Sequence, residues 1–439
     1  MVWLFQFLFM IPKEQIGEAA KWWLHQSIKT MERTLSHLNS YLVLRKGIWV
    51  DEILKLAQSL KVDAVYWNEC FDPKSIASDE KLINELNESN ILGRKFKGNV
   101  LHHPLDIKTK SGSPFKVYSA FWKALIEQPV QTPYPVIKKV ASPPSPVTLT
   151  DLNLLPKKNW YEKFHTYWKV GEDHAQRLLG EFLEDKLVSY SLGRDFPSKK
   201  NISQLSPYLV SGQISSRFIF YSIKNYQPDI DDSTETFLRE IVWREFSHYL
   251  LFNYPELVNE PLNKRFLNFT WDWDEEKFHL WTKGLTGYPL VDAGMRELWE
   301  TGYMHNRVRM VVASFLTKHL LIPWQKGAEW FENTLLDADI ANNRCNWQWV
   351  AGTGVDAQPY FRIFNPTMQG KKFDESGEYI RKWVPELKAL PNNYIHNPSD
   401  APEEVLKSAN IQLGRNYPHP IVEHKFARER ALERYGEIK

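Results

Sequence analysis

The segment Phe237-Leu-Arg-Glu-Ile-Val-Trp-Arg-Glu-Phe-Ser-His contains side chains that suit both stacking and charge recognition. The spacing i, i+3, i+4 and i+7 relates Glu240, Trp243, Arg244 and Ser247, so a helix places these four side chains on one face. A flat aromatic ring beside a guanidinium offers a stacking surface next to a phosphate contact. The alternative is an ordinary solvated helix face with one tryptophan.

A second helical segment, Met304-His-Asn-Arg-Val-Arg-Met-Val-Val, carries a polar stripe on an apolar surface. The stripe consists of Asn306, Arg309, Met310 and Ala313. A buried arginine without a carboxylate is costly, so Asp337 or Asp339 is the expected partner of Arg309, and a purely structural ion pair is the alternative. These two acids lack a neighbouring His or Cys to complete a ligand set, and we expect no metal there.

A third segment runs from Tyr190-Ser-Leu-Gly-Arg-Asp-Phe-Pro to Asn201-Ile-Ser-Gln-Leu-Ser-Pro-Tyr-Leu and gathers hydroxyl groups near a predicted helix start. The N–H groups at the start of a helix attract anions such as phosphate. The pattern therefore indicates an anion site, with a plain helix cap followed by a turn as the alternative.

The first hundred residues alternate short apolar runs with helical stretches at 19–38 and 50–60. The apolar runs lie at residues 2–9, 41–44 and 64–67. Strands separated by helices predict a parallel sheet, so we expect an α/β domain over residues 1–103.

The remaining chain divides into a connector and a helical part. Residues 104–159 are rich in Pro, Ser and Thr, which predicts a long connector without helix or central strand. From residue 160 to residue 439 helical periodicity dominates, so the three segments above belong to an expected all-α domain.

Composition narrows the function only slightly. The chain has 55 Lys and Arg against 53 Asp and Glu, so a nucleic acid would have to meet a local basic patch. The two cysteines, Cys70 and Cys345, provide neither a disulfide framework nor a cysteine-rich zinc site, and they fit a reducing cytoplasm. The opening MVWLFQFLFM is too short to span a membrane. The 18 tryptophans indicate stacking on bases or a flat cofactor, or electron transfer, with aromatic packing as the alternative.

The runs TGYPLVDAGMRELWETGYMHNRVRM and WQWVAGTGVDAQPYFRIFNP resemble the photolyase and cryptochrome family, in particular its class I cyclobutane pyrimidine dimer photolyases. Five separated motifs occur in the order and spacing of the family, and together they cover the C-terminal two-thirds of the chain. The resemblance implies a Rossmann-like domain followed by an all-α domain that holds FAD. It also implies light-driven DNA repair, in which excited reduced FAD passes an electron to the dimer.

The resemblance also implies roles for individual residues. Ser203 to Ser206 would hold the pyrophosphate, Arg309 would pair with Asp337, Asp339 would meet the edge of the flavin ring, and Asn343 would face flavin N5. The full set of implied FAD contacts is Tyr190, Ser203, Gln204, Leu205, Ser206, Phe237, Glu240, Arg244, Asn306, Arg309, Asp337, Asp339 and Asn343.

By the same resemblance, electrons reach the flavin through Trp347, Trp324 and Trp271. Trp243 and Trp349 would form the walls of the dimer pocket. Photolyases are a known case of base flipping, so that step follows from the resemblance and not from the residues themselves. The implied contacts to DNA and the dimer are Arg194, Glu240, Trp243, Arg244, Asn306, Arg307, Met310, Trp349 and Arg362.

The resemblance leaves the second chromophore and several rival functions open. Folate-binding relatives have an Asn-Glu pair where Pro73 and Lys74 stand here, so a deazaflavin, another flavin or no antenna is favoured over folate. A cryptochrome photoreceptor is the nearest rival, but no long tail follows the last motif. Repair of the (6-4) photoproduct relies on a histidine pair, whereas His305-Asn306 stands here. A nicotinamide oxidoreductase would need a GxGxxG motif, which the chain lacks.

The start of the chain departs most from the family. Relatives open with a strand and a helix that precede a strand resembling VWLFQFLFMIP, whereas Met1 here directly adjoins that second strand. We therefore expect that the first strand of the sheet is missing and that neighbouring strands lose a partner. A reading frame that starts upstream, or an N-terminal domain without a working antenna, would follow. We further expect a monomer in the cytoplasm, associated with the nucleoid if the source is bacterial.

Overall fold

A computed structural model of the chain describes residues 16–98, 100–135, 138, 152–357 and 359–438. The chain forms two compact units. Unit 1 comprises residues 1–185, 203–255 and 336–341, and unit 2 comprises residues 186–202, 256–335 and 342–439. Both units draw on more than one stretch of sequence, so residues distant in the chain contribute to each.

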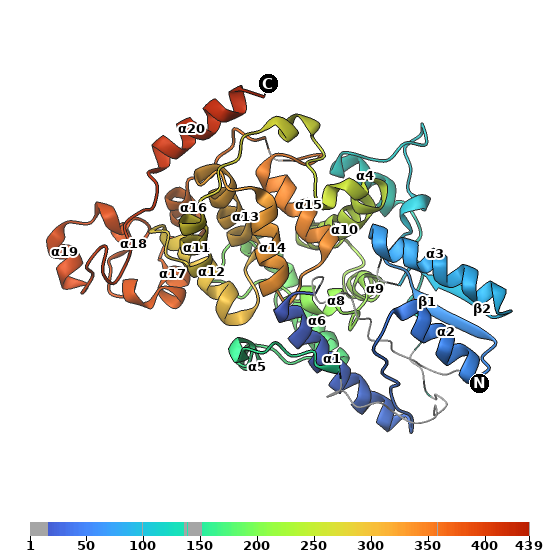
Figure 1. Cartoon of the computed structure of the whole chain (residues 1–439). Helices are drawn as coiled ribbons and strands as arrows, with labels where there is room; N and C mark the ends of the chain where they lie inside the picture. The colour runs from blue at the N-terminus through green and yellow to red at the C-terminus, as the bar shows by residue number, and fades with distance from the viewer. Residues whose placement is uncertain (1–15, 99, 136–137, 139–151, 358, 439) are drawn as a thin grey trace. The chain divides into compact units, whose positions relative to one another are not determined.

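Unit 1 contains a small parallel sheet. Strand β1 (Ala64–Asn68) pairs in parallel with β2 (Leu92–Phe96), and Ala64 lies opposite Leu92. Parallel neighbours need a crossover, which helix α3 (Pro73–Glu88) provides, and α2 (Trp49–Ser59) packs beside it (Figure 1). The buried side chains of this α/β core are Val50, Ile53, Ala57, Leu82, Leu86 and Ile91.

The sequence-based expectations for this region are confirmed in part. Helices α1 (Glu18–His37) and α2 form as predicted, and β1 matches the expected strand. The expected strand at 41–44 is wrong for the described residues, since this run is buried but forms no strand. Leu42 and Leu44 pack against helix α1 instead, and such packing needs the same apolar residues as a strand does. The apolar run 2–9 lies outside the described residues.

The other helices of unit 1 follow the sheet in sequence. They are α4 (Tyr118–Ile126), α5 (Phe164–Tyr167), α6 (Glu172–Asp185), α8 (Ser206–Val210), α9 (Ser216–Tyr226) and α10 (Asp232–Asn253). Helix α4 contradicts the expectation that the connector 104–159 holds no helix. It occupies a stretch without proline, and its Tyr118 donates a hydrogen bond to the Arg239 carbonyl of α10 at 2.7 Å. The average composition of the segment concealed this local helix.

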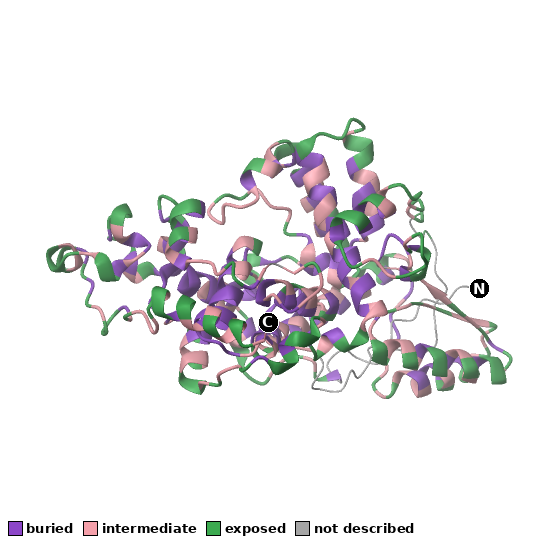
Figure 2. Cartoon of the chain, turned by 90° about the horizontal axis from the view of Figure 1, so that it is seen from above, coloured by how far each residue is buried: buried purple, intermediate pink, exposed green. Residues whose placement is uncertain are grey.

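Unit 2 is helical, as predicted. Its helices are α7 (Tyr190–Gly193), α11 (Glu275–Lys283), α12 (Pro289–Thr301), α13 (Asn306–Ser314), α14 (Trp324–Thr334), most of α15 (Ile340–Ala351), α16 (Pro366–Phe373), α17 (Glu378–Trp383), α18 (Asn392–Ile395), α19 (Glu403–Ser408) and α20 (His424–Gly436). A π-helical turn, η7 (Phe315–His319), directly follows α13. Most of the longer helices expose one stripe and bury the other (Figure 2), the pattern of helices around a core.

A buried carboxylate ties α12 to the C-terminal segment of unit 2. Asp292 is fully buried and accepts hydrogen bonds from Thr286 N and Thr286 Oγ1 at 2.7 Å, from Gly287 N at 3.1 Å and from Tyr417 Oη at 2.8 Å. Gly287 has a φ of +77°, and a Cβ there would lie 2.4 Å from the His419 backbone. Only glycine therefore suits this close approach.

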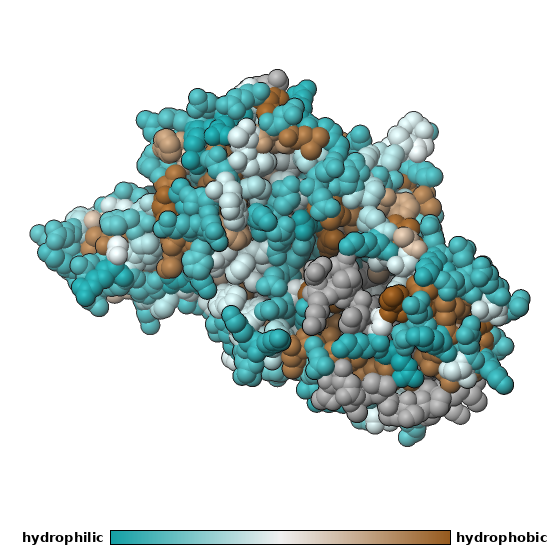
Figure 3. Space-filling model, in the orientation of Figure 1, coloured by the Kyte–Doolittle hydropathy of each residue, from teal (hydrophilic) through white to brown (hydrophobic). Residues whose placement is uncertain are grey.

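The surface is mainly hydrophilic, with separate apolar patches on the face drawn in Figure 3. Among the helices that the structure describes, none combines the length and the apolar composition needed to cross a membrane.

Candidate functional site

Helix α10 positions the first group of predicted site residues in unit 1. Asp231 caps the helix by accepting from Thr234 N at 2.7 Å. Arg244 and Ser247 are buried, while Trp243 is half-buried. The alternative of an ordinary solvated face is therefore wrong. A polar face buried inside a unit needs partners, and Ser247 Oγ donates to the Trp243 carbonyl at 3.1 Å.

One face of the Trp243 ring is already occupied. The ring stacks on Tyr118 with a centroid distance of 3.6 Å and an angle of 5° between the planes. This contact fixes the plane of the indole, and the edge contact with Phe246 at a centroid distance of 6.0 Å adds to it. Tyr118 did not stand out in the sequence, since it lies in the segment taken for a connector.

Arg244 lies beside a second buried charge. Its Nη1 is 3.6 Å from Glu245 Oε1, and Glu245 also accepts a hydrogen bond from Leu101 N at 2.7 Å. Burial raises the pKa of Glu245 to about 7, and the nearby Arg244 opposes this shift. Arg244 has only 8% of its surface exposed. Burial to this extent suits contact with a cofactor better than contact with DNA phosphates.

Residues 203–209 of the predicted anion segment lie in unit 1, whereas residues 190–202 belong to unit 2. Helix α8 begins at Ser206, whose Oγ donates a 2.6 Å hydrogen bond to Asp337 Oδ2. Gln204 adopts a φ of +55°, and Ser203 Oγ accepts from Leu205 N at 3.4 Å. The structure thus brings the hydroxyl-rich segment together with one of the two predicted acids, although no side chain caps this short helix.

The second acid, Asp339, has a partner that sequence reasoning missed. His248 Nε2 of α10 lies 3.5 Å from Asp339 Oδ2. Burial lowers the pKa of His248 to about 4, although the Asp339 carboxylate acts in the opposite direction. His248 follows Arg244 by four residues, so the helical spacing that selected Arg244 contained the signal for this histidine.

Phe237 and Leu205, two further predicted FAD contacts, are also in unit 1. Both are buried, and the Phe237 ring lies 4.4 Å from the Phe182 ring of α6. Glu240 is half-buried on α10. These positions provide apolar walls near the polar groups described above.

In unit 2, helices α14 and α15 together fix the orientation of Asn343. Its Nδ2 donates to the Ala328 carbonyl at 2.9 Å and to Glu332 Oε1 at 3.1 Å. Glu332 in turn accepts from Arg344 Nε at 2.6 Å and from Arg344 Nη2 at 2.7 Å. Because both acceptors require the amide nitrogen, the remaining group of Asn343 is its Oδ1 acceptor. This side chain therefore suits a ligand that presents an N–H donor.

The three predicted electron carriers also lie in unit 2. Trp347 and Trp324 are buried, with 2% and 1% of their surface exposed, and Trp271 is partly buried. The Trp347 ring lies against Gly327 of α14, where an added Cβ would come within 2.1 Å of the ring. The Arg344 guanidinium lies 6.0 Å from the Trp324 ring centroid. Gly327 was not singled out in the sequence, because nothing local marks a glycine that accommodates a distant ring.

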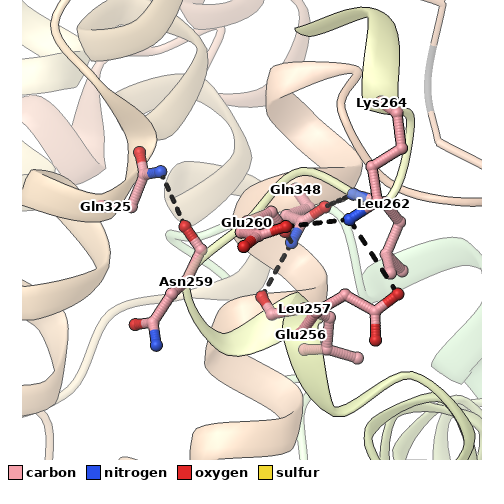
Figure 4. Close-up of polar contacts among 8 residues, drawn as sticks. All are labelled: Glu256, Leu257, Asn259, Glu260, Leu262, Lys264, Gln325 and Gln348. Carbon is pink, nitrogen blue, oxygen red and sulfur yellow. Dashed lines mark hydrogen bonds and ion pairs between the residues drawn. The ribbon is translucent and has the colours of Figure 1, made fainter. Parts of the chain in front are cut away.

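Gln348 separates the predicted electron carrier Trp347 from the predicted pocket wall Trp349. Its Oε1 accepts from Leu262 N at 3.0 Å, and its Nε2 donates to the carbonyls of Leu257 and Glu260 at 2.8 Å each (Figure 4). An amide with these buried hydrogen bonds holds α15 to the segment 256–264. The rotation of α15 about its axis is set by this residue, which the sequence did not reveal.

In unit 2, helix α13 carries the predicted stripe, but the expectation that Arg307 points away from it is wrong, since Arg307 Nη1 lies 3.9 Å from the Met310 sulfur. Arg307 Nη2 pairs with Asp195 Oδ2 at 2.6 Å, and its guanidinium lies over the Phe373 ring. Arg309 Nε donates to the Met304 carbonyl at 2.7 Å. Asn306 is exposed. Arg309 and Asp337 belong to different units, so their predicted pairing stays a prediction.

Other predicted site residues of unit 2 lie near its surface. The Arg194 guanidinium lies 5.4 Å from the centroid of the buried Tyr190 ring. Met310 and Trp349 are half-buried, and Arg362 is exposed. Among the described parts of the chain, no group of three or more His, Cys, Asp or Glu residues is arranged to hold a metal ion.

Two family models match the chain. The model described as the FAD binding domain of DNA photolyase matches residues 237–437, and the model described as DNA photolyase matches residues 4–138. These matches include helix α10 from residue 237 onward, helices α11 to α20 and the small parallel sheet.

Individual relatives extend the match over almost the whole chain. A deoxyribodipyrimidine photo-lyase of Agrobacterium fabrum is 46% identical over 431 residues, which cover 97% of this chain and 90% of the relative. Cryptochrome-2 of Arabidopsis thaliana is 37% identical over 94% of this chain and 70% of the relative. The crystal structure of a bacterial class III photolyase from Agrobacterium tumefaciens has a TM-score of 0.96 and 44% identity, and the match covers 100% of this chain and 92% of that structure. The chain belongs to the DNA photolyase and cryptochrome family.

Proposed function

We propose that this chain is a deoxyribodipyrimidine photo-lyase, which uses light to split cyclobutane pyrimidine dimers in DNA. The observation that carries the proposal is the 46% identity to a photo-lyase of that name over 97% of the chain. The match to the FAD binding domain model supports FAD as the cofactor. FAD in its reduced, excited form would supply the electron that opens the dimer, and the protein would supply binding and electrostatics.

Asn343 provides the test of whether the residues fit FAD. Its amide nitrogen is engaged with Ala328 and Glu332, so Oδ1 is the group available to a ligand. Flavin N5 carries a proton in the reduced cofactor, and an oxygen acceptor suits that N–H group. We therefore assign Asn343 to flavin N5.

The other FAD contacts are assigned by the family motifs. Ser206 and Asp337 already share a hydrogen bond, which supports a common polar site for the ribityl and pyrophosphate part of the cofactor. Asp339, held beside His248, would accept from the edge of the flavin ring. The proposed FAD set is Tyr190, Ser203, Gln204, Leu205, Ser206, Phe237, Glu240, Arg244, Asn306, Arg309, Asp337, Asp339 and Asn343.

Light-driven reduction of FAD would pass through Trp347, Trp324 and Trp271. Trp243 and Trp349 would stack on the flipped dimer, and each stacked base would contribute about 1–3 kcal/mol. Phosphates would meet arginines, which contact the backbone without reading sequence. The proposed DNA and dimer contacts are Arg194, Glu240, Trp243, Asn306, Arg307, Met310, Trp349 and Arg362, whereas the buried Arg244 is assigned to FAD alone.

The remaining assignments are also proposals. The domain division is residues 1–103, 104–159 and 160–439, and the protein acts as a cytoplasmic monomer. The antenna site holds a deazaflavin, another flavin or no chromophore. For the class within the family, the motifs suggested class I, but the 44% identity to a structure described as a class III photolyase favours class III.

Repair of synthetic DNA is the direct test. The FAD-loaded chain, chemically reduced, is illuminated with blue light in the presence of an oligonucleotide that contains one thymine dimer. We expect the dimer to disappear in the light and to persist in the dark, as separated by chromatography. Trp243→Ala, which removes a stacking wall, should weaken dimer binding while FAD absorbance is retained.

The second candidate function is a cryptochrome-type photoreceptor, which the 37% identity to Cryptochrome-2 favours. A photoreceptor would photoreduce FAD but leave the dimer oligonucleotide unchanged. An oligonucleotide with a (6-4) photoproduct forms the third arm of the experiment, and repair of that lesion alone would replace the proposed substrate.

A further inference from the structure

Lys318 is a charged side chain in the interior of unit 2 that the proposed reaction does not use. Only 1% of its surface is exposed, and it lies in the π-helical turn η7. Lysine is almost never buried in this way without a carboxylate partner. A π-helical turn often marks a functional position, because it interrupts the regular hydrogen bonds of a helix.

Lys318 makes a hydrogen bond to the loop that carries Arg362. Lys318 Nζ donates to the Arg362 carbonyl at 3.2 Å, and the ammonium lies 5.3 Å from the centroid of the Tyr360 ring. Tyr360 is buried and Ile363 packs against the same apolar cluster, whereas Phe361 and Arg362 are exposed. Two anchored side chains thus flank two exposed ones, and Lys318 contacts the backbone carbonyl of the second exposed residue, Arg362.

We propose that Lys318 is a positioning residue for DNA binding, and that its protonated form holds the Arg362 loop in place for a phosphate of the bound strand. The inference rests on the proposed function, because Arg362 is one of the proposed phosphate contacts. A hydrogen bond from an ammonium to a carbonyl is about twice as strong as one from a neutral amine.

The environment allows this proton to be lost near neutral pH. Burial lowers the pKa of Lys318 to about 7. The protonated form dominates below that value, so loop anchoring and DNA affinity should both fall as the pH rises through 7.

Other titratable groups near η7 differ from Lys318 in the direction or size of their pKa shifts. Burial is the first cause that lowers the pKa of His319 to about 3, and burial also lowers the pKa of His424 from its ordinary value. Burial raises the pKa of Tyr360 above the neutral range. Three helices pack against η7, namely α13, α14 and α20. Their charged and titratable groups, with those of the loop at Tyr360, are Arg307, Arg309, Lys326, Glu329, Glu332, His424, Lys425, Arg428, Glu429, Arg430, Glu433, Arg434, Tyr435, Tyr360 and Arg362. Tyr288 contacts the His319 ring, and Asp272 pairs with Arg430 and Arg434.

The test compares DNA binding by Lys318→Met with binding by the native FAD-loaded chain from pH 6.0 to 8.5, using fluorescence anisotropy of a thymine-dimer oligonucleotide. Methionine has a similar volume, and replacement of a buried charge by an apolar group is often neutral for stability. The native Kd should rise roughly three- to tenfold over this range, as one pKa unit corresponds to a factor of ten. Lys318→Met should bind weakly at every pH, with this rise absent.

A double-mutant cycle shows whether Lys318 acts through Arg362. In an Arg362→Gln background, Lys318→Met should have no further effect on Kd. The matched control is Lys407→Met, which removes an exposed lysine of α19 paired with Glu403 and should leave the pH profile unchanged. FAD absorbance and the thermal midpoint confirm that each variant is folded. If Lys318→Met does not fold, Lys318→Arg replaces it in the test. This variant keeps the positive charge at every pH of the range, so its DNA affinity should not depend on pH.

The outcomes separate this inference from the proposed function. Repair by the native chain combined with equal pH profiles for native and Lys318→Met proteins would overturn the role of Lys318 alone. The role of Lys318 would also be overturned if Lys318→Met weakened DNA binding equally in the native chain and in the Arg362→Gln background. Failure of the native chain to bind dimer-containing DNA would overturn both proposals.

Discussion

Replacement of Gly327 by alanine tests the proposed electron path through a single added methyl group. Gly327 lies on α14, one turn after Trp324, and the Trp347 ring of α15 lies against it. The new Cβ would come 2.1 Å from Trp347 Cη2, 2.5 Å from Cζ3 and 2.6 Å from Cζ2. Ordinary contact begins at 3.4 Å, so the ring has to withdraw by about 1.3 Å.

This displacement has two expected consequences. Overpacking of a well-packed core costs about 1–3 kcal/mol of unfolding free energy, since the ring and its neighbours Phe331 and Trp281 must shift together. Light-driven reduction of oxidised FAD should slow, because electron transfer weakens steeply with distance and Trp347 is the proposed first donor. Repair by chemically reduced enzyme should persist, since that route does not need the tryptophans.

The assay follows FAD absorbance during illumination with an external electron donor, together with the thermal midpoint. Gly180→Ala is the matched control, because this glycine lies within α6 and nothing approaches its added Cβ within 4 Å. A helical Gly→Ala change with free space stabilises by roughly 0.5–1 kcal/mol. If Gly327→Ala melts and photoreduces like Gly180→Ala, the packing argument for Trp347 is refuted.

Four further changes address other parts of the structure. Trp347→Phe should stop light-driven FAD reduction and leave repair by chemically reduced enzyme intact, and normal photoreduction would remove Trp347 from the path. Glu332→Gln should lower the free energy of unfolding by roughly 1–3 kcal/mol, and the Asn343 amide should lose its fixed orientation. The thermal midpoint and the rate of photoreduction measure these two effects. If both values equal those of the native chain, the role of Glu332 is contradicted. Asp292→Ala should lower the free energy of unfolding by roughly 2–5 kcal/mol in urea, because four donors lose their acceptor, and a loss under 1 kcal/mol would speak against the buried network. Burial lowers the pKa of His319 to about 3, so the unfolded chain binds a proton below about pH 6.5 that the native chain does not. The free energy of unfolding should therefore fall by up to roughly 1.4 kcal/mol per pH unit as the pH drops below this value. In urea unfolding, His319→Phe should reduce this slope.

The sequence predicted what depends on local spacing. The α10 face with Trp243 and Arg244 is an example, since helical periodicity alone brings these residues together. Strand β2 escaped notice because Leu92–Phe96 reads LGRKF, with a glycine and two charges, and its pairing with β1 is a tertiary effect. The strand expected at 41–44 failed for the related reason that apolar burial against a helix resembles apolar burial in a sheet.

The candidate site shows the same division. Family motifs identified Asn343, but only the contacts with Ala328 and Glu332 determine which end of its amide a ligand meets. Lys318 was passed over because lysine is normally a surface residue, and its burial depends on the loop at Tyr360, far away in sequence. Long-range packing of this kind has no local pattern from which it could be read.

The position of Gln348 restricts how helix α15 can rotate about its own axis. Successive residues on a helix point about 100° apart, so Trp347 and Trp349 face directions well separated around α15, with Gln348 between them. The hydrogen bonds of Gln348 prevent the helix from rotating to favour one tryptophan. Any substitution that turns α15 would therefore alter the proposed electron supply and the proposed dimer pocket at once, and these two properties should change together in variants rather than independently.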